Sequence, residues 1–437
     1  IVSGDYPGIG SGDPDLYKAF CWRFWRLSTN DGGYLGVVLP RSALSGKGLS
    51  DFRNSIISSA SKVDVVTLKN HLGWVFDGVT PQYTISLLCI KHGKPHRNSI
   101  RLRGPFVSLA ELKTDISPDS MSFDREEIKS WTHTVSLPLL PRADSVEVFA
   151  QLRKSPRLDL KIDGQWRARP DRELDATNQK PLMDLESVDC PDGYWPVYKG
   201  ESFDLWNPDT GIYYAWADPE AVLDFLQKKR WRAWNNPRSP HSEFPIEVHE
   251  DHNTLPCFSP RIAFRDIARA TDRRTVITCL VPPNVSLTNA APYFLFPHGD
   301  QKDQSFLLGV LSSIPLDWYA RRFVETHVNF FVINPFPVPR PSPENSLWIR
   351  TVEIAGRLAS TDDRFAEWAQ KVGVECGPLE DAEKEDLIYE LDAVVAHLYE
   401  LSEPQLIHIF ETHREGYDYK DRITGVLRHY QKWTQRL

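Results

Sequence analysis

The sequence contains little methionine, no paired cysteine motif and no long apolar run. Only two of its 437 residues are methionine, and its six cysteines are scattered without a Cys-x-x-Cys pair. This pattern argues against a zinc site and predicts reduced thiols, as in the cytoplasm. No apolar run approaches the roughly 20 residues that a transmembrane helix needs, and the first residues lack the basic segment and apolar core of a signal peptide. We therefore expect a cytoplasmic protein with no metal site and no membrane partner.

An overall excess of positive charge is also lacking. The net charge of −8 argues weakly against a simple binder of polyanions. Lys and Arg nevertheless gather in residues 153–172, 228–238 and 261–274, while the acidic excess lies near residues 375–403. Because local patches matter more than the total for phosphate contacts, nucleic-acid binding is not excluded.

The chain begins without a methionine. Its first residue is Ile1, and a glycine-rich stretch from Gly8 to Gly12 runs straight into a helical pattern. We expect a chain that is cut inside a domain, with a large N-terminal part missing. Because Gly8 to Gly12 follows no strand in this chain, we interpret it as a segment leading from a missing catalytic loop rather than as a cofactor-binding loop.

The first part of the sequence has the pattern of an α/β sheet. Residues 15–29 predict a helix with one apolar face. That face is formed by Leu16, Phe20 and Phe24, with Leu27 close by. Tyr34 to Leu39 form an apolar run short enough for a buried parallel strand. A helix that ends near residue 57 and strands at 63–68 and 83–90 follow. Strand, helix, strand and strand at this spacing indicate one edge of an α/β sheet.

The pattern changes near residue 95, where prolines become frequent and strands short. The expected elements are a helix at 218–234, strands at 261–267 and 275–281, and helices at 306–313 and 316–324. Five prolines between residues 334 and 343 predict an extended connector. Amphipathic helices are then expected at 347–358, 362–372, 382–399, 403–410 and 417–432. The fold class is therefore α/β followed by α+β, with domains at 1–95, 96–343 and 344–437.

Several strings in the first part match one known family. DLYKAF (residues 15–20) precedes GGYLGVVLPRSALSG (32–46), and Leu49 to Arg53 follow. They resemble the stretch after the catalytic loop of the γ-type adenine-N6 DNA methyltransferases of the Eco57I-like group. In that family an Asp-Leu-Tyr helix leads to a strand ending in Pro-x-Ser and then to a Leu-Arg helix. Residues 63–93 resemble the last two strands that follow.

Later strings continue the resemblance in the family's order. They are WPVYKG (195–200), RIAFRDIARATDRRTVITCLVPPN (261–284), SFLLGVLSSIPLDWYARRFV (305–324), NPFPVP (334–339) and ELDAVVAHLYELSEPQLIHIF (390–410). The resemblance implies a partial Rossmann-like methyltransferase sheet, then a mixed β-rich target-recognition domain and a helical C-terminal region. It further implies S-adenosylmethionine as cofactor, site-specific methylation of double-stranded DNA by base flipping, and a restriction-modification or phage-defence system.

Two motifs of the family are absent from this sequence. Neither the glycine-rich cofactor loop after a strand nor an Asn-Pro-Pro-aromatic loop occurs, because Asn207-Pro208 and Asn334-Pro335 lack the second proline. The catalytic residues are therefore expected upstream of Ile1, on an N-terminal methylase half that would be a partner, with other defence-system subunits as further partners. The alternative is a non-enzymatic DNA-specificity or assembly module. Nothing in the chain supports an attached nuclease or helicase.

The resemblance implies cofactor-binding residues in two places. Asp15, Tyr17 and Phe20 lie where the family's helix approaches the cofactor. Pro40 and Ser42 follow a strand at its carboxyl end, where ligands bind in open α/β sheets. The alternatives are packing of the helix with N-capping by Asp15, and a simple turn at Pro40 and Ser42.

Two basic segments are candidates for DNA contact. The first contains Arg261, Arg265, Arg269, Arg273 and Arg274, four of which recur at every fourth residue. An Arg bidentate to guanine is the commonest specific base contact, although such spacing also suits a solvated helix face. The second contains Lys228, Lys229, Arg230 and Arg232, interleaved with tryptophan as in backbone binders. A helix end with buried tryptophans explains that segment equally well.

Two further groups of polar residues are candidates for binding. Arg321 and Arg322 could also touch phosphate. His249, Asp251 and His252 lie close together in the sequence, but a polar loop without helical i, i+4 spacing is a poor metal site.

Overall fold

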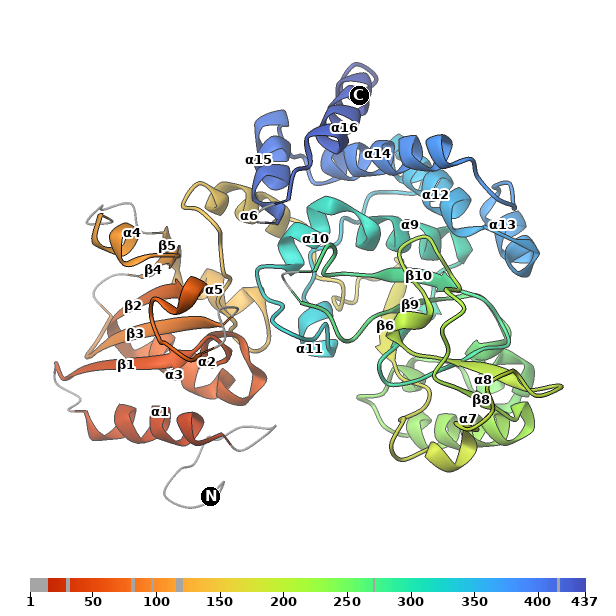
Figure 1. The fold of residues 1–437 in the computed structure, drawn as a ribbon, viewed down its shortest axis with the longest axis horizontal. Coiled ribbons are helices and arrows are strands. Elements are labelled where there is room, and N and C mark those ends of the chain that lie inside the picture. Colours follow the sequence, from red (N-terminus) through yellow and green to blue (C-terminus); the bar gives the residue numbers. More distant parts are fainter. Residues whose placement is uncertain are drawn as a thin grey trace. The chain divides into compact units, whose positions relative to one another are not determined.

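The computed structural model describes residues 15–28, 32–79, 83–95, 98–114, 121–269, 272–414 and 417–437 (Figure 1). The glycine-rich stretch from Gly8 to Gly12 lies outside these residues. Contacts divide the chain into two units. Unit 1 is Ile1–Arg153 with Arg321–Glu325, and unit 2 is Lys154–Ala320 with Thr326–Leu437.

Unit 1 is built on a five-stranded mixed sheet. Its strands are β1 (Tyr34–Pro40), β2 (Ala60–Lys69), β3 (Thr84–His92), β4 (Ser99–Phe106) and β5 (Met121–Asp124). They are hydrogen-bonded in the order β1-β3-β2-β4-β5. Strand β3 is antiparallel to both β1 and β2, so β1 and β2 run parallel to each other. The domain boundary expected near residue 95 would fall between β3 and β4. Since both strands belong to this sheet, the sheet continues past that position.

Strand β1 corrects one expectation. The apolar run predicted a parallel strand buried on both faces, whereas β1 is an edge strand that pairs antiparallel with β3. Val38 is 54% exposed. An edge strand with one neighbour among the described residues leaves alternate side chains uncovered, so an apolar run by itself does not establish burial.

The helices of unit 1 are α1 (Leu16–Leu27), α2 (Ser42–Ser45), α3 (Ser50–Ser59), α4 (Leu109–Thr114), α5 (Arg125–Trp131) and α6 (Ser145–Arg153). The predicted apolar face of α1 exists but points outward: Leu16 is 76% exposed and Leu27 64%. Instead, Cys21 is buried on the opposite side. Trp25 stacks on His92 of β3 with ring centroids 3.5 Å apart. The helix is therefore held by the side that carries Cys21 and Trp25.

A short segment from later in the chain completes unit 1. Arg322 accepts a backbone hydrogen bond from Leu139 at 2.8 Å, and Phe323 lies 6.0 Å from the ring of Phe149. The side chains of Arg321 and Arg322 are buried, with 3% and 6% exposed. The prediction that these two side chains touch phosphate is therefore wrong, because phosphate cannot reach a buried guanidinium.

Unit 2 contains two smaller sheets. The four-stranded sheet has the order β10-β9-β12-β6, and the three-stranded sheet has the order β11-β7-β8. Their strands are β6 (Arg167–Asp171), β7 (Trp195–Tyr198), β8 (Ala215–Ala217), β9 (Arg261–Phe264), β10 (Thr278–Val281), β11 (Ser286–Leu287) and β12 (Tyr293–His298). Buried side chains such as Tyr198, Phe203 and Tyr293 share one hydrophobic cluster. The strands expected at 261–267 and 275–281 are confirmed, although both are shorter.

Most helices of unit 2 were predicted, but the short ones at Ile246–Glu250 and Phe330–Ile333 were not, and the helix expected at 316–324 ends at Ala320. The helices of unit 2 are α7 (Pro219–Trp234), α8 (Ile246–Glu250), α9 (Gln301–Ser312), α10 (Ile314–Ala320), α11 (Phe330–Ile333), α12 (Ser346–Ala359), α13 (Ala366–Val372), α14 (Asp381–Leu398), α15 (Glu403–His413) and α16 (Lys420–Thr434). The proline-rich residues between α11 and α12 form neither helix nor strand, as expected. The C-terminal region is therefore helical. Within the described parts of the chain, no helix has the length and apolarity to span a membrane.

Candidate functional site

The candidate cofactor residues lie around one edge of the sheet of unit 1. Because β1 and β2 are parallel, their carboxyl ends meet at the same edge, where ligands bind in open α/β sheets. Strand β1 ends at Pro40 and is followed by the turn that carries Ser42. Strand β2 ends at Lys69 and is followed by Asn70.

The structure brings two of the predicted cofactor residues together. Tyr17 of α1 and Ser42 at the start of α2 share a hydrogen bond of 3.0 Å between their hydroxyl oxygens. Both side chains are half-buried. Burial is the main cause that raises the pKa of Tyr17 above its usual value, so the phenol is neutral near pH 7. The pair therefore offers hydrogen bonding rather than general acid or base chemistry.

The other three predicted cofactor residues lie apart from this pair. Asp15 occupies the N-cap position of α1 but makes no side-chain capping bond, and its carboxylate lies 3.4 Å from Lys18. Phe20 is 47% exposed and stacks on Phe24, with ring centroids 5.6 Å apart. Pro40 is exposed at the end of β1. The alternative interpretation was N-capping by Asp15. Asp15 has the N-cap position, but its side chain makes no capping hydrogen bond.

A buried arginine fixes the backbone beneath Ser42. The side chain of Arg53 in α3 is 1% exposed. It donates to the backbone carbonyls of Ala43 at 2.8 Å, Gly46 at 2.7 Å and Thr134 at 2.6 Å. Burial lowers its pKa to about 9, so it remains protonated at neutral pH. Arg53 thus ties α2 to the segment after α5. Sequence reasoning named this residue only as part of a motif and missed its function.

A second buried arginine holds the same turn from the other side. Arg41 donates to the carbonyl of Arg322 at 2.8 Å and lies 3.6 Å from Glu325. Glu325 also accepts a hydrogen bond of 3.0 Å from Ser45. Since the turn is anchored on both sides, the hydroxyl of Ser42 is held in a defined position, as a binding group requires.

A loop organised by one asparagine stands at the same edge of the sheet. Asn70 is fully buried, and its side chain makes four hydrogen bonds to the loop backbone, to Val75, Val79 and twice to Phe76, at 3.0–3.1 Å. The loop presents Leu72, 85% exposed, and Phe76, 45% exposed. Sequence reasoning did not single out this segment. The signal that it missed is an asparagine directly after a buried strand.

The first basic segment is not a helix face. Arg261 begins β9, and the described residues between β9 and β10 form no helix, so the solvated-helix interpretation is wrong. The Arg261 side chain is 4% exposed and lies 2.8 Å from Glu173, which is itself buried. Arg265 donates to the carbonyl of Phe203 at 2.6 Å, and Arg274 donates to that of Ser312 at 2.7 Å. These three arginines have partners inside unit 2.

Arg269 and Arg273 are the two exposed members of this segment. The backbone N–H of Arg269 is bound by the Asp272 carboxylate at 2.9 Å. The first basic segment contains both buried and exposed arginines, so it presents only part of its positive charge to solvent.

The second basic segment lies at the end of α7. Arg230 is 2% exposed and donates to the Thr254 hydroxyl at 2.8 Å and to the Asp251 carbonyl at 2.9 Å. Lys229 is half-buried, with its ammonium 3.2 Å from the carbonyl of Glu173. Lys228 is exposed and pairs with Asp224 at 2.6 Å. Arg232 is exposed in the last turn of the helix.

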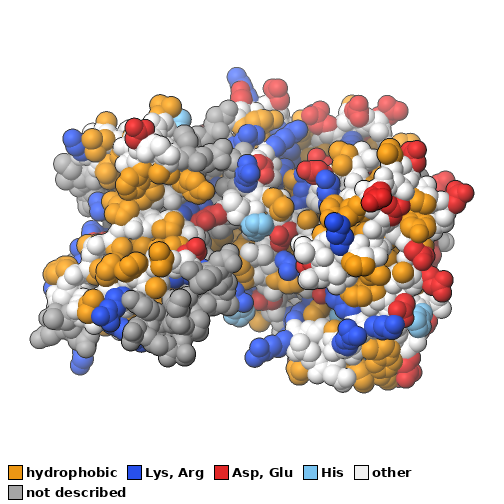
Figure 2. Space-filling model, turned by 60° about the horizontal axis from the view of Figure 1, so that its bottom comes forward, with side chains coloured by type: hydrophobic (Ala, Val, Ile, Leu, Met, Phe, Trp, Pro, Cys, Tyr) orange, Lys and Arg blue, Asp and Glu red, His pale blue; other side chains and the backbone are white. Residues whose placement is uncertain are grey.

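The tryptophans beside these residues are not buried, because Trp231 is exposed and Trp234 is half-buried. Trp231 and Trp234 meet edge to face, with ring centroids 5.8 Å apart, and Trp231 is 37% exposed. Figure 2 shows one face of the molecule, on which Lys and Arg side chains lie among acidic and hydrophobic ones. Among the described residues, no group of three or more His, Cys, Asp or Glu side chains is placed to hold a metal ion.

Comparisons with known proteins found similarity only in structure. No known protein-family model matches the sequence, and no curated protein matches it either. The Type IIL restriction-modification enzyme MmeI, solved in complex with DNA, is 10% identical with a TM-score of 0.42 over 96% of this chain and 52% of its own. The type IIG restriction endonuclease BpuSI is 13% identical with a TM-score of 0.31, over 91% and 50%. The Type ISP restriction-modification enzyme LlaGI, also solved with a DNA substrate mimic, is 11% identical with a TM-score of 0.37, over 81% and 32%.

The chain is therefore structurally similar, at low identity, to parts of restriction-modification enzymes. It spans about half the length of the first two of these structures and about a third of the third. These TM-scores lie below 0.5, so the similarity does not by itself establish a function for this chain.

Proposed function

We propose that this chain supplies the end of an S-adenosylmethionine-dependent adenine-N6 methyltransferase fold together with the DNA target-recognition region, in a restriction-modification or phage-defence system. The observation that carries the proposal is the sheet order β1-β3-β2. Strand β3 comes last of the three in the sequence but lies between β1 and β2, which are parallel to each other, and is antiparallel to both. This is the arrangement expected at the end of a Rossmann-like methyltransferase sheet. It occurs in the residues whose motifs resemble that family.

The free side of β1 supports a partner that continues the sheet. Strand β1 has one neighbour among the described strands, so one row of its backbone N–H and C=O groups is open to pairing. The outward face of α1, with Leu16, Phe20, Phe24 and Leu27 all more than a third exposed, adds an apolar stripe. Exposed apolar patches of this kind mark interaction sites. We propose that this partner is the N-terminal methylase half, either in the same polypeptide or in a second one.

The hydroxyl pair at the sheet edge can bind polar groups of a cofactor. Tyr17 and Ser42 form this pair, with their oxygens 3.0 Å apart, whereas Phe20 lies apart from it on the outward face of α1. When bound, S-adenosylmethionine supplies the sulfonium methyl group. The residues named here bind and orient, and proximity of this kind contributes much of the rate of a group transfer.

Phe76 is our candidate for the aromatic face that holds the extruded adenine. A base must leave the helix stack before its amino group can react, and stacking on an aromatic ring stabilises the flipped state. Phe76 projects from the Asn70 loop at the sheet edge that Ser42 also borders. DNA itself would be bound by the exposed cations of the two basic segments of unit 2. They are Arg269, Arg273, Lys228 and Arg232.

The test is transfer of a labelled methyl group from S-adenosylmethionine to duplex DNA by the intact protein with any chain that co-purifies. We expect N6-methyladenine in the DNA, and Phe76→Ala should lower the rate by about ten-fold or more through lost base stacking of roughly 1–3 kcal/mol. Phe296→Ala changes a ring in unit 2 and serves as the control. A preparation that binds DNA equally well with and without the cofactor, and transfers no methyl group, would instead support a non-enzymatic specificity module.

A further inference from the structure

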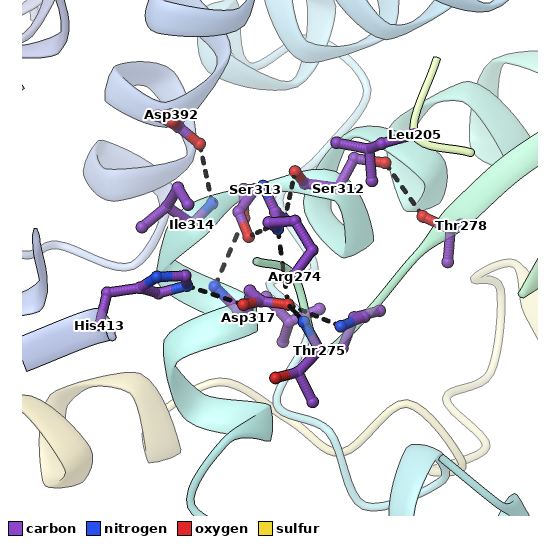
Figure 3. A network of polar contacts seen from close by, with 12 residues as sticks. Leu205, Arg274, Thr275, Thr278, Ser312, Ser313, Ile314, Asp317, Asp392 and His413 are labelled. Atoms are coloured by element: carbon purple, nitrogen blue, oxygen red, sulfur yellow. Dashed lines mark hydrogen bonds and ion pairs between the residues drawn. The ribbon is translucent and has the colours of Figure 1, made fainter. Parts of the chain in front are cut away.

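A fully buried carboxylate lies at the centre of a polar network in unit 2 (Figure 3). Asp317 of α10 is 0% exposed. One of its oxygens accepts the backbone N–H groups of Thr275 at 2.8 Å and Val276 at 2.6 Å. The other accepts a hydrogen bond of 2.7 Å from His413 at the end of α15. The second ring nitrogen of His413 is 2.6 Å from the hydroxyl of Tyr419.

The number of partners makes this network an anchor. A carboxylate out of contact with water is strongly destabilising unless donors and cations surround it. Besides His413 and the two N–H groups, Asp317 has the Nε of Arg274 at 3.5 Å. Arg274 in turn donates to the carbonyls of Ser312 and Ser313 at the end of α9. Residues 274–276 are thereby fixed to the junction of α9 and α10.

The fixed residues directly follow the exposed arginines of the first basic segment. Arg273 is exposed and adjoins Arg274, which is buried. The other end of the segment is also held, because Ala268 donates to the carbonyl of Thr326 at 3.2 Å and Val328 donates to that of Asp266 at 2.7 Å. Contacts to DNA phosphates set the register of a protein on the duplex. A backbone that is already ordered before binding makes such contacts at a lower entropic cost.

We propose that Asp317, together with His413 and Tyr419, positions Arg269 and Arg273 for DNA, so that helices α15 and α16 take part in DNA binding without touching it. The inference rests on the DNA-recognition role proposed above and deepens it. Asp317 is a positioning residue, because it acts through the backbone of Thr275 and Val276.

The matched control for Asp317 is Asp392 of α14. Asp392 is 1% exposed, accepts the backbone N–H of Ile314 at 2.8 Å and pairs with Arg422 at 2.6 Å. Both carboxylates therefore hold α10 and both have a cation beside them. Only Asp317 reaches the arginine segment. Asp317→Ala and Asp392→Ala should lower thermal stability to a similar degree.

The experiment measures binding of the intact protein to a labelled mixed-sequence duplex over a range of salt concentrations, at a temperature where each variant is folded. We expect Asp317→Ala to weaken binding about ten-fold and to reduce the slope of log K against log salt by about 1–2 units, while Asp392→Ala matches wild type within about two-fold. His413→Leu should behave as Asp317→Ala does. His413→Gln, which keeps a donor for Asp317, should restore binding.

Trypsin provides a second measurement that needs no DNA. Cleavage after Arg269 and Arg273 under native conditions should be faster in Asp317→Ala or, if that variant fails to fold, in His413→Leu, and unchanged in Asp392→Ala. Equal effects of Asp317→Ala and Asp392→Ala on DNA binding and on cleavage would overturn the inference. A wild-type protein that does not bind DNA would overturn the recognition role itself, a different and distinguishable result.

Discussion

At the scale of single residues, burial separates the arginines by function. Arg261, Arg230 and Arg274 each have less than a tenth of their surface exposed, and each donates to acceptors inside unit 2. The sequence shows where these cations lie but not which are covered. The partner of Arg261, for example, is Glu173, 88 residues away. Only the folded chain brings such pairs together.

We predict that the exposed arginines act on DNA binding and the buried ones on stability. Arg269→Ala with Arg273→Ala should weaken DNA binding about ten-fold and lower the salt slope by about two, because two phosphate contacts are lost. Lys371→Ala with Arg436→Ala removes the same charge elsewhere in unit 2 and should change neither. Binding isotherms at several salt concentrations measure both the affinity and its salt slope. Equal effects of the two pairs would mean that the segment contributes only bulk charge.

The variant Arg261→Leu tests the effect of a buried arginine on stability. It leaves the buried carboxylate of Glu173 without its cation, and breaking a buried pair costs about 3–5 kcal/mol. Thermal unfolding should reveal the loss. Below the unfolding transition, the affinity for DNA should stay that of the wild type, and a selective loss of affinity would contradict the assignment.

At the scale of helices and strands, the sequence predicts what local signals encode. The start of α12 follows from Asn345, whose side chain caps Leu347 and Trp348. The start of α15 follows from a capping box between Ser402 and Gln405. Strand neighbours could not be predicted in the same way. The antiparallel partner of β1 lies about 50 residues later in the sequence, and an apolar run fits a parallel or an antiparallel strand equally well.

The helix pair α9 and α12 gives an element-scale prediction. A Cβ at Gly309 would lie 2.8 Å from the Thr351 methyl group and 3.1 Å from the Ala355 Cβ. Gly309→Val should therefore lower the free energy of unfolding by about 1–3 kcal/mol, the usual result of overpacking, despite a better helix propensity. Chemical denaturation measures the change. Lys302→Leu, on the exposed side of α9, is the control and should be close to neutral. An unchanged midpoint for Gly309→Val would show that the two helices can move apart without loss.

At the scale of the whole molecule, the resemblance predicted a partial methyltransferase sheet. The structure has a five-stranded mixed sheet whose edge strand β1 has one neighbour among the described strands. The helical C-terminal region and the short strands before it were expected from periodicity and turn residues. The middle of the chain is not β-rich, however, because its two small sheets lie among helices such as α7 and α9. The division into two units was not expected, because Arg321–Glu325 returns to unit 1 from a distant part of the sequence. Such a return depends on Arg41 meeting the carbonyl of Arg322 and the carboxylate of Glu325, and no local pattern encodes it.

The open side of β1 gives the prediction at this scale. Those backbone N–H groups of β1 that point away from β3 have no strand partner among the described residues, so they should exchange with solvent rapidly in this chain alone. Addition of the methylase half that we propose as partner should slow their exchange, because a further strand would then pair along Tyr34–Pro40. Hydrogen exchange read by mass spectrometry or NMR measures both states. Strand β3, which is paired on both sides, is the internal control and should be protected throughout. Exchange of β1 that stays rapid in the assembled protein would show that the partner docks elsewhere, and the exposed face of α1 alone would then be the remaining candidate surface.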